Sequence, residues 1–352
     1  MAPRELVVVG GVDCHSEFHH AVALDERGRW LGELRFAATR AGYGRAVRWF
    51  AAWGHVEAVG VESSGSYGAG LARALTEGGI RVVEVNRPHP HLRHLRGKSD
   101  AIDAEAAARK VLAGEATAVP KDTTGVVEAI RELKTARESA VKARAAALVQ
   151  LRDLIFTAPA ALREALGGKS LRAQAALCRR LRPDRGRIQE PAEAAKFALR
   201  SLARRIASLD AEVAELDGEL EVLVHRAAPR TVALLGLGVI HTAQLLVTAG
   251  QNIGRVRAEA SFAHLCGVDP IPASSGKTTR HRLNPGGDRA ANSALHMIAV
   301  VRMRHCDRTR AYVARRIHEG RGKREIVRCL KRYIAREVYR SLQADLGASL
   351  AP

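Results

Sequence analysis

The segment LVVVGGVD, Leu6 to Asp13, is an uninterrupted run of apolar residues and glycines that stops at an aspartate. A short apolar run of this kind predicts a buried β-strand. The next segment, 19–37 (HHAVALDERGRWLGELRFA), predicts two more strands joined by a turn at Asp25 to Gly28. The chain therefore opens with three consecutive strands, which decides how the following elements can be arranged.

The elements that follow complete an α/β pattern. Segment 42–53 predicts a helix, 56–63 (VEAVGVES) a strand, 67–79 a helix closed by two glycines, and 80–86 a further strand. Three strands, helix, strand, helix and strand is the order of an RNase H-like α/β domain. We therefore expect an RNase H-like mixed sheet in the N-terminal part of the chain.

Four carboxylates occupy special places in this pattern. Asp13 and Glu62 end neighbouring strands, where open α/β sheets usually bind ligands. In GKSDAID, 97–103, Asp100 and Asp103 stand three residues apart at the start of a predicted helix and share one face. Converging carboxylates repel one another unless a cation neutralises them, and an all-oxygen site suits Mg²⁺ or Mn²⁺.

The same GKSDAID segment has a simpler interpretation. Asp100 at the N-cap and Asp103 at the third helical position would satisfy free amides and the helix dipole without any metal. Taken alone, that capping interpretation is the stronger one. The basic run before it, 89–96 (HPHLRHLR), makes the change of charge abrupt.

The charge of the whole chain indicates a polyanionic partner. The 352 residues carry a formal net charge of +19, with arginine strongly preferred over lysine, and guanidinium groups bind phosphates bidentately. A high-GC genome, which inflates arginine and alanine, is the alternative explanation. Aromatic residues make up only 4% of the chain, which argues against a base-stacking platform for single strands.

Cysteines and hydropathy indicate the compartment. The five cysteines are odd in number and scattered without CxxC spacing, which favours reduced thiols over disulfides or a zinc site. No apolar run approaches membrane-spanning length, and LVVVGGV is too short for a signal peptide. We expect a cytoplasmic protein with no membrane partner.

Segment 121–228 is rich in alanine, leucine and arginine and predicts long helices. Near its end, apolar residues step alternately by four and three, as in a coiled-coil seam. That seam is Leu202, Ile206, Leu209, Val213, Leu216, Leu220 and Leu223. We expect a helical hairpin or coiled coil that supports a dimer or tetramer.

Segment 229–352 predicts a mainly α-helical domain. Two helical runs flank Gly236 and Gly238 in the pattern of a helix-hairpin-helix, whose turn amides can hold a phosphate, although a plain turn looks the same. A polar, basic loop over 273–289 ends at Asp288, which can cap the next helix. The basic tail helix offers candidate phosphate contacts, with a solvated charged face as the alternative: Arg324, Arg328, Lys331, Arg332, Arg336 and Arg340.

Several of these motifs, in order, resemble the IS110-family transposases. They are GVDCHS, VESSGSYGAGLARAL, GKSDAIDAEAAARKVLAG, LLGLGVIHTAQLL, FAHLCGVDPIPASSGK and PGGDRAANSAL. The resemblance implies a RuvC-like DEDD domain over 1–120, a helical coiled-coil linker over 121–228, and a C-terminal transposase domain over 229–352.

The resemblance also implies residue roles. The DEDD metal ligands would be Asp13, Glu62, Asp100 and Asp103, and the nucleophile would be Ser275, with the adjacent Ser274 as the alternative. Cations close behind it would offset charge on the reacting phosphate: Lys277, Arg280, His281 and Arg282. Asn292 stands where many relatives carry an arginine, so we assign it no phosphate contact.

The implied function is a DNA transposase or recombinase of an insertion sequence. It would use Mg²⁺ or Mn²⁺, act as a homo-oligomer on element ends and target DNA near the nucleoid, and select DNA through an element-encoded guide RNA. Rival interpretations are a metal-only RuvC-like Holliday-junction nuclease, a sugar kinase with a phosphate loop at GVDCHS, and a non-catalytic DNA-coating protein. The kinase would need a second phosphate motif, which the sequence lacks.

Overall fold

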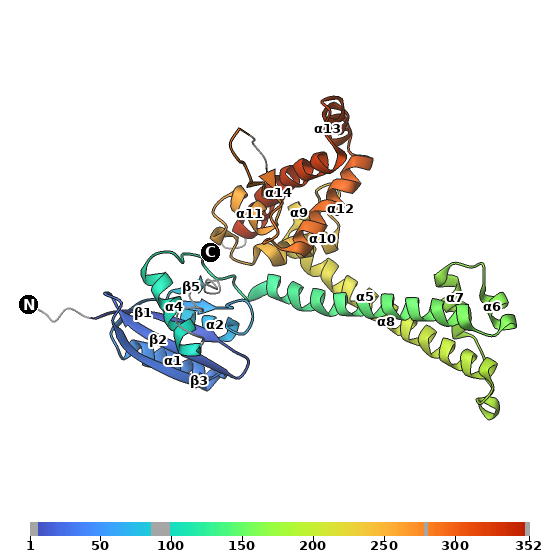
Figure 1. Cartoon of the computed structure of the whole chain (residues 1–352), viewed down its shortest axis with the longest axis horizontal. Helices are drawn as coiled ribbons and strands as arrows, with labels where there is room; N and C mark the ends of the chain where they lie inside the picture. Colours follow the sequence, from blue (N-terminus) through green and yellow to red (C-terminus); the bar gives the residue numbers. More distant parts are fainter. Residues whose placement is uncertain (1–5, 86–98, 278–280, 349–352) are drawn as a thin grey trace, which may run out of the picture. The chain divides into compact units, whose positions relative to one another are not determined.

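The structure, a computed structural model, describes residues 6–85, 99–277 and 281–348 (Figure 1). The chain divides into two compact units. The first consists of Met1–Gly125 and Ala249–Ser261, and the second of Val126–Thr248 and Phe262–Pro352. The basic run 89–96 and Arg280 lie outside the described residues. The three domains expected from the sequence stay a prediction.

The first unit is built on one five-stranded sheet in the order β3-β2-β1-β4-β5. β1 is antiparallel to β2 and parallel to β4, and β2 and β3 are antiparallel while β4 and β5 are parallel. The strands are β1 (Val7–Cys14), β2 (Phe18–Asp25), β3 (Trp30–Ala37), β4 (His55–Glu62) and β5 (Val82–Val85). The predicted mixed sheet at the N-terminus, followed by mostly helical segments, is thus confirmed.

Helices cover both faces of this sheet (Figure 1). On one face, α1 (Arg40–Ala51) and α2 (Ala69–Glu77) contact each other and bury Phe50 and Leu71 against Val8 and Val12. On the other face, α4 (Asp100–Leu112) packs against β1, β2 and β4 through Ala104 and Ala108. The order of elements along the chain therefore places α4 across the strands that carry Asp13 and Glu62.

Two glycines let α4 approach the sheet closely. A Cβ added at Gly11 would lie 2.2 Å from the Ala104 carbonyl oxygen and 2.3 Å from the Ala108 nitrogen. A Cβ added at Gly60 would lie 2.8 Å from the Val111 side chain. Gly11 and Gly60 are register partners on β1 and β4, so together they form a surface without side chains against which α4 packs.

Gly11→Ala is expected to lower the free energy of unfolding of the first unit by about 3 kcal/mol, because the new methyl group would overlap helix backbone that cannot move aside. All three tryptophans, Trp30, Trp49 and Trp53, lie in this unit, so their fluorescence in a urea titration reports its unfolding. Gly65→Ala is the matched control, because a Cβ there meets nothing within 4 Å. Equal stabilities of the two variants would contradict this account of how α4 packs.

The start of α4 differs in one detail from the sequence expectation. Ser99, not Asp100, is the N-cap: its side chain accepts a hydrogen bond from the Ile102 amide at 3.3 Å. Asp100 and Asp103 both lie inside the first turn. The capping interpretation of Asp100 is therefore wrong, because the preceding serine already satisfies the free amide.

The long central helices form an antiparallel pair in the second unit, drawn in green and yellow in Figure 1. α5 (Gly125–Thr157) and α8 (Pro191–Ala227) are joined by ion pairs from Arg137 to Asp217 and from Arg144 to Asp210. From the first ion pair to the second, the arginine moves seven residues forward on α5 and the aspartate seven residues back on α8, which fixes the register of the antiparallel pair. Short helices connect the end of α5 to the start of α8: α6 (Ala160–Leu166), α7 (Leu171–Arg179) and η1 (Arg185–Arg187).

In the predicted seam on α8, Ile206, Val213 and Leu220 are buried, while the leucines between them are half-buried. The helical content of this segment is as predicted. The coiled-coil classification and its use in oligomerisation stay predictions.

The C-terminal part is mainly helical, in line with the sequence expectation. Within the second unit, the Asp345 carboxylate accepts hydrogen bonds from the Thr231 amide at 2.9 Å and its hydroxyl at 2.7 Å. The elements are α9 (Pro229–Val232), α10 (Val239–Ala249), η2 (Ile253–Arg255), α11 (Glu259–Leu265), β6 (Ile271–Pro272), β7 (His281–Arg282), α12 (Arg289–His305), α13 (Asp307–His318) and α14 (Lys323–Ala348). The predicted cap is confirmed, because the Asp288 side chain accepts from the amides of Ala290 and Ala291. Among the described helices, none combines the length and apolar composition needed to cross a bilayer.

Candidate metal centre

The strand pairing brings Asp13 and Glu62 to one edge of the sheet. β1 and β4 are parallel with Val12 opposite Val61, so the next residues, Asp13 and Glu62, stand at the same level. Side chains alternate along a strand, so both share the face of Gly11 and Gly60 on which α4 packs. The acidic ends of two strands therefore face the first turn of α4.

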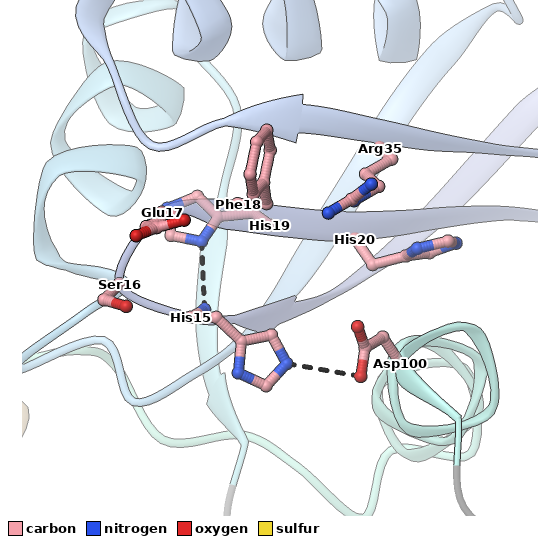
Figure 2. A pocket seen from close by; sticks show the side chains of 8 residues that line it. All are labelled: His15, Ser16, Glu17, Phe18, His19, His20, Arg35 and Asp100. Carbon is pink, nitrogen blue, oxygen red and sulfur yellow. Dashed lines mark hydrogen bonds and ion pairs between the residues drawn. The ribbon is translucent and has the colours of Figure 1, made fainter.

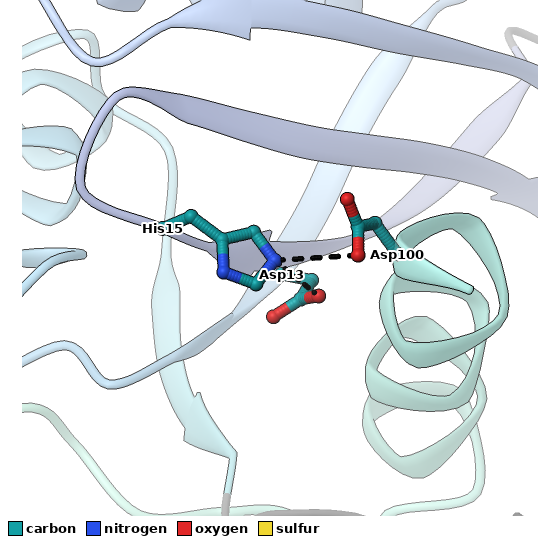
Figure 3. Close-up of side chains that lie close together, drawn as sticks. All are labelled: Asp13, His15 and Asp100. Carbon is teal, nitrogen blue, oxygen red and sulfur yellow. Dashed lines mark hydrogen bonds and ion pairs between the residues drawn. The ribbon is translucent and has the colours of Figure 1, made fainter. Parts of the chain in front are cut away.

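Three side chains meet at this edge (Figure 3). The Nε2 atom of His15 lies 3.1 Å from Oδ2 of Asp13 and 3.4 Å from Oδ1 of Asp100. One ligand atom from each of Asp13, His15 and Asp100 lies within 4.8 Å of the other two. The strand end and the helix start thus converge on one small volume, although they are far apart in the sequence.

The charges in this cluster act on one another. Burial raises the pKa of the Asp13 carboxyl, His15 lowers it, and the carboxylates of Asp103 and Asp100 raise it, with a net increase above the ordinary value. Asp13 and Asp103 are only 7% and 5% exposed, so water screens their repulsion poorly. A buried set of like charges of this kind favours a cation between them.

Glu62 lies nearby but outside the cluster of three that the described residues form. Burial, together with the charges of Asp13 and Glu62, raises the pKa of the Cys14 thiol. Glu62 therefore acts electrostatically on the same strand end. Of the four carboxylates predicted from the sequence, Asp13, Asp100 and Asp103 are grouped by these interactions, and Glu62 flanks them.

The donor set fits a divalent cation. Carboxylate oxygens are the ligands that Mg²⁺ and Mn²⁺ prefer, and Mn²⁺ also accepts an imidazole nitrogen. Asp13 and Asp100 could each offer a carboxylate oxygen and His15 a ring nitrogen, and the charge of Asp103 acts on Asp13 beside them. The sequence interpretation missed His15. His15 lies one residue beyond the end of β1, so no strand periodicity in the sequence pointed to it.

A cleft of about 280 Å³ opens beside the cluster, lined by residues of the β1–β2 turn and by Asp100 (Figure 2). Its wall carries the guanidinium of Arg35, 4.2 Å from the centroid of the Phe18 ring. The His20 Nε2 atom lies 3.1 Å from the Glu33 carboxylate. Asp100 and His15 of the cluster therefore line a cleft that also carries a guanidinium and further imidazole side chains, which suits a phosphate group.

The predicted serine lies in the other unit. Ser275 and Ser274 are both exposed on the connection between β6 and β7, and the following Gly276 has a positive φ of 53°. Lys277 on the same connection is also exposed, as are His281 and Arg282 of β7. The loop thus presents hydroxyls next to cations, and the role of Ser275 stays a prediction.

The other predicted phosphate contacts lie in different surroundings. Gly236 has a positive φ of 86° in the turn that joins α9 to α10, and Gly238 precedes α10. On α14 four of the arginines are exposed: Arg324, Arg328, Arg336 and Arg340. Lys331 and Arg332 are only half-buried, and Lys331 donates to the Asn292 side chain at 2.7 Å.

Asn292 in turn donates to the carbonyl oxygen of Gly267 at 2.7 Å, which links α14 and α12 to the turn after α11. Burial lowers the pKa of the Lys331 ammonium. Lys331 therefore has a structural partner inside the domain, a role that the charge pattern of the helix did not indicate.

Comparisons with known proteins agree with this architecture. The first matching family model covers residues 10–157 and describes a DEDD transposase of the IS110 type. A second, described as "Transposase IS116/IS110/IS902 family", covers residues 233–314. Both matches define a protein of the transposase class, with the acidic sheet edge inside the first match and the serine loop inside the second.

The chain belongs to the IS110 family of transposases. A curated relative is the "Insertion element IS900 uncharacterized 42 kDa protein" of Mycobacterium paratuberculosis, 28% identical over 134 residues. The alignment covers 37% of this chain and 34% of the relative, so it spans about a third of the relative's length.

Proposed function

We propose that this protein is a DNA transposase or recombinase of an insertion sequence, which cuts and rejoins DNA strands with a serine nucleophile and a divalent-metal DEDD site. The observation that carries the proposal is the convergence of Asp13, His15 and Asp100 at the end of β1, where the charge of Asp103 also acts on Asp13. The sheet order β3-β2-β1-β4-β5, with β2 antiparallel, supports an RNase H-like domain of the RuvC-like type.

In this proposal Asp13, Glu62, Asp100 and Asp103 hold Mg²⁺ or Mn²⁺. A bound cation of this kind polarises a phosphate oxygen and neutralises charge at the reacting centre. The carboxylates bind and orient, and the cleft beside Arg35 and His20 receives the flanking DNA backbone. His15, which contacts two of the acids, positions their oxygens.

The Ser275 hydroxyl is the nucleophile. Its oxygen forms a bond to phosphorus while the bond from phosphorus to the 3′ oxygen breaks; the serine proton goes to a base and the departing 3′ oxygen takes up a proton. The resulting phosphoserine keeps a phosphodiester bond, so the strands can be rejoined without ATP. Lys277, Arg280, His281 and Arg282 would offset negative charge on the phosphate.

The partners follow from charge and family. A net charge of +19 suits DNA and RNA backbones. We include in the proposal a guide RNA encoded beside the gene, a homo-oligomer joined through α5 and α8, and a location at the bacterial nucleoid in the cytoplasm. Sequencing the nucleic acid that copurifies with the protein tests the guide: a discrete RNA from the flank of the gene supports it, and random fragments contradict it.

Chelation of divalent cations is expected to abolish strand transfer on a plasmid that carries the gene's flanking DNA. The buried carboxylates need a positive partner to bind a polyanion, so EDTA removes both the charge balance and the phosphate activation. Readdition of Mg²⁺ or Mn²⁺ restores product on a gel, whereas Ca²⁺ serves as a control for charge without the same geometry. Full activity in EDTA would exclude a metal-dependent reaction.

A further inference from the structure

A second cleft lies within the C-terminal helices, away from the acidic cluster in sequence. It has a volume of about 1060 Å³ and is walled by α12, α13, α14 and the turn that holds Leu235. Figure 1 shows these three helices gathered together in orange and red. None of the roles proposed above uses this cleft, except that Arg336 and Arg340 of the basic tail line it.

Its electrostatics are strongly positive. Arg308, Arg315, Arg336 and Arg340 line it, and the only carboxylate in its lining, Glu337, already pairs with Arg302. Arg308 and Arg340 form no ion pair with any residue that the structure describes. Guanidinium groups without a carboxylate partner are suited to bind phosphates, which they contact bidentately.

Its floor and walls are apolar and aromatic. Tyr333 is 53% exposed, and its ring centroid lies 5.8 Å from that of Tyr312, with the planes at 85°. The guanidinium carbon of Arg315 lies 5.5 Å from the Tyr312 centroid. The buried Leu330 and Ile334 also line the cleft. A largely exposed aromatic ring beside apolar side chains is suited to stack against a flat apolar ring.

This arrangement bears on an expectation drawn from composition. The low aromatic content argued against base stacking, but two of the chain's five tyrosines are gathered in this cleft beside unpaired cations. Base stacking needs one or two rings in the right place, and the average composition does not measure placement.

We infer that this cleft binds an unpaired nucleotide of single-stranded DNA, with the base stacked on Tyr333 and the flanking phosphates on Arg308 and Arg340. A duplex keeps its bases stacked inside, so only an unpaired base can reach the ring face. The inference rests on the proposed function in one respect: strand cutting leaves unpaired DNA near the break.

The test uses the full chain carrying Asp13→Asn, so that no strand is broken during the measurement. A 12-nucleotide oligo-dT containing 5-iododeoxyuridine is bound and irradiated, and the crosslinked peptide is identified by mass spectrometry. We expect the crosslink at Tyr333 or Tyr312, and none with the duplex form. Crosslinks found only elsewhere, or equally with duplex, would overturn the inference.

Affinity provides the second readout. Tyr333→Ala is expected to weaken oligo-dT binding about tenfold, because a single base–aromatic stack is lost, while Tyr333→Phe keeps the affinity. Tyr67→Ala, which removes a 59%-exposed tyrosine from the first unit, is the matched control and leaves affinity unchanged. Equal losses in the alanine and phenylalanine variants, or tenfold tighter binding of oligo-U than of oligo-dT, would contradict the assignment.

Cys306 gives a local footprint of the same cleft, since its thiol lines the wall. Hydrogen bonds from Thr309 lower the pKa of this thiol, whereas Cys14, Cys178 and Cys266 are buried. Oligo-dT is expected to slow iodoacetamide labelling of Cys306, and Tyr333→Ala to relieve that protection. Protection that persists unchanged in Tyr333→Ala would count against the stacking site.

These results separate the inference from the proposed function. If the wild type carries out strand transfer but its cleft gives neither crosslink nor footprint, the proposed function stands and the inference is wrong. If the cleft binds single-stranded DNA in a protein without strand transfer, the reverse holds.

Discussion

Asp13→Asn is expected to abolish DNA strand transfer, by about 10³-fold or more, while leaving the fold intact. The substitution removes one negative charge and one strong ligand from the buried edge where β1 meets α4. A metal ion at a reacting phosphate is worth several kcal/mol, and each 1.36 kcal/mol changes a rate about tenfold. Product formation on a gel, at saturating Mg²⁺, measures the loss.

The same substitution has an opposite expected effect on stability. The pKa of Asp13 is raised in the folded protein, so its ionised form is disfavoured there. At neutral pH the charge of Asp13 therefore lowers stability, and this loss disappears only when the pH falls below the pKa of Asp13 in the unfolded chain. Asn is neutral and can still accept a hydrogen bond from His15. Without metal, Asp13→Asn is therefore expected to melt at or above the wild-type temperature.

A matched control separates site from surface. Glu57→Gln removes an exposed carboxylate at the opposite end of β4, where it lies 3.8 Å from Arg81, and is expected to leave strand transfer unchanged. Mg²⁺ should raise the melting temperature of the wild type and of Glu57→Gln, but not that of Asp13→Asn. Strand transfer that survives in Asp13→Asn would contradict the metal centre.

The part of this site that could be predicted was the part set by local sequence. Apolar runs ending in Asp13 and Glu62 predicted strand ends, and the parallel pairing of β1 with β4 places both at one level. The spacing of Asp100 and Asp103 predicted a shared helix face. These inferences need only the periods of strands and helices.

Other features depend on tertiary packing and could not be predicted. Nothing in the sequence tells whether Ser99 or Asp100 caps the helix, since both residue types cap well. His15 acquires its role only when α4 brings Asp100 within 3.4 Å. Lys331 was predicted to contact phosphate because charge alone does not show which face of a helix turns inward. In the structure, Lys331 donates a hydrogen bond to the side chain of Asn292.

The cleft around Tyr333 illustrates the same limit at a larger scale. Its cations and rings come from α12, α13 and α14, and only the packing of these helices gathers them. A composition-based exclusion counts residues over the whole chain. It does not measure whether a few side chains are concentrated in one place, as Tyr312 and Tyr333 are.

Ser275→Ala is expected to eliminate the covalent protein–DNA adduct, by about 10³-fold or more, because the hydroxyl that would bond to phosphorus is gone and water is not held in its place. The measurement is denaturing electrophoresis of protein incubated with end-labelled DNA, which retains the adduct, followed by mass spectrometry of the phosphoserine peptide. DNA binding by the variant should match wild type, since the exposed cations Lys277 and Arg282 remain.

Ser274→Ala is the matched control for Ser275→Ala, because both serines are exposed on the same connection and differ by one position. A surface substitution of this kind changes free energies by about 0.5 kcal/mol at most, so its adduct level should stay within about twofold of wild type. Loss of the adduct in Ser274→Ala alone would move the nucleophile by one residue. Cleavage without any adduct in both variants would instead favour a nuclease that uses water, because the carboxylates at the β1 edge can act on DNA without a serine. A rejoining reaction that needs no ATP, by contrast, depends on the bond energy stored in the phosphoserine.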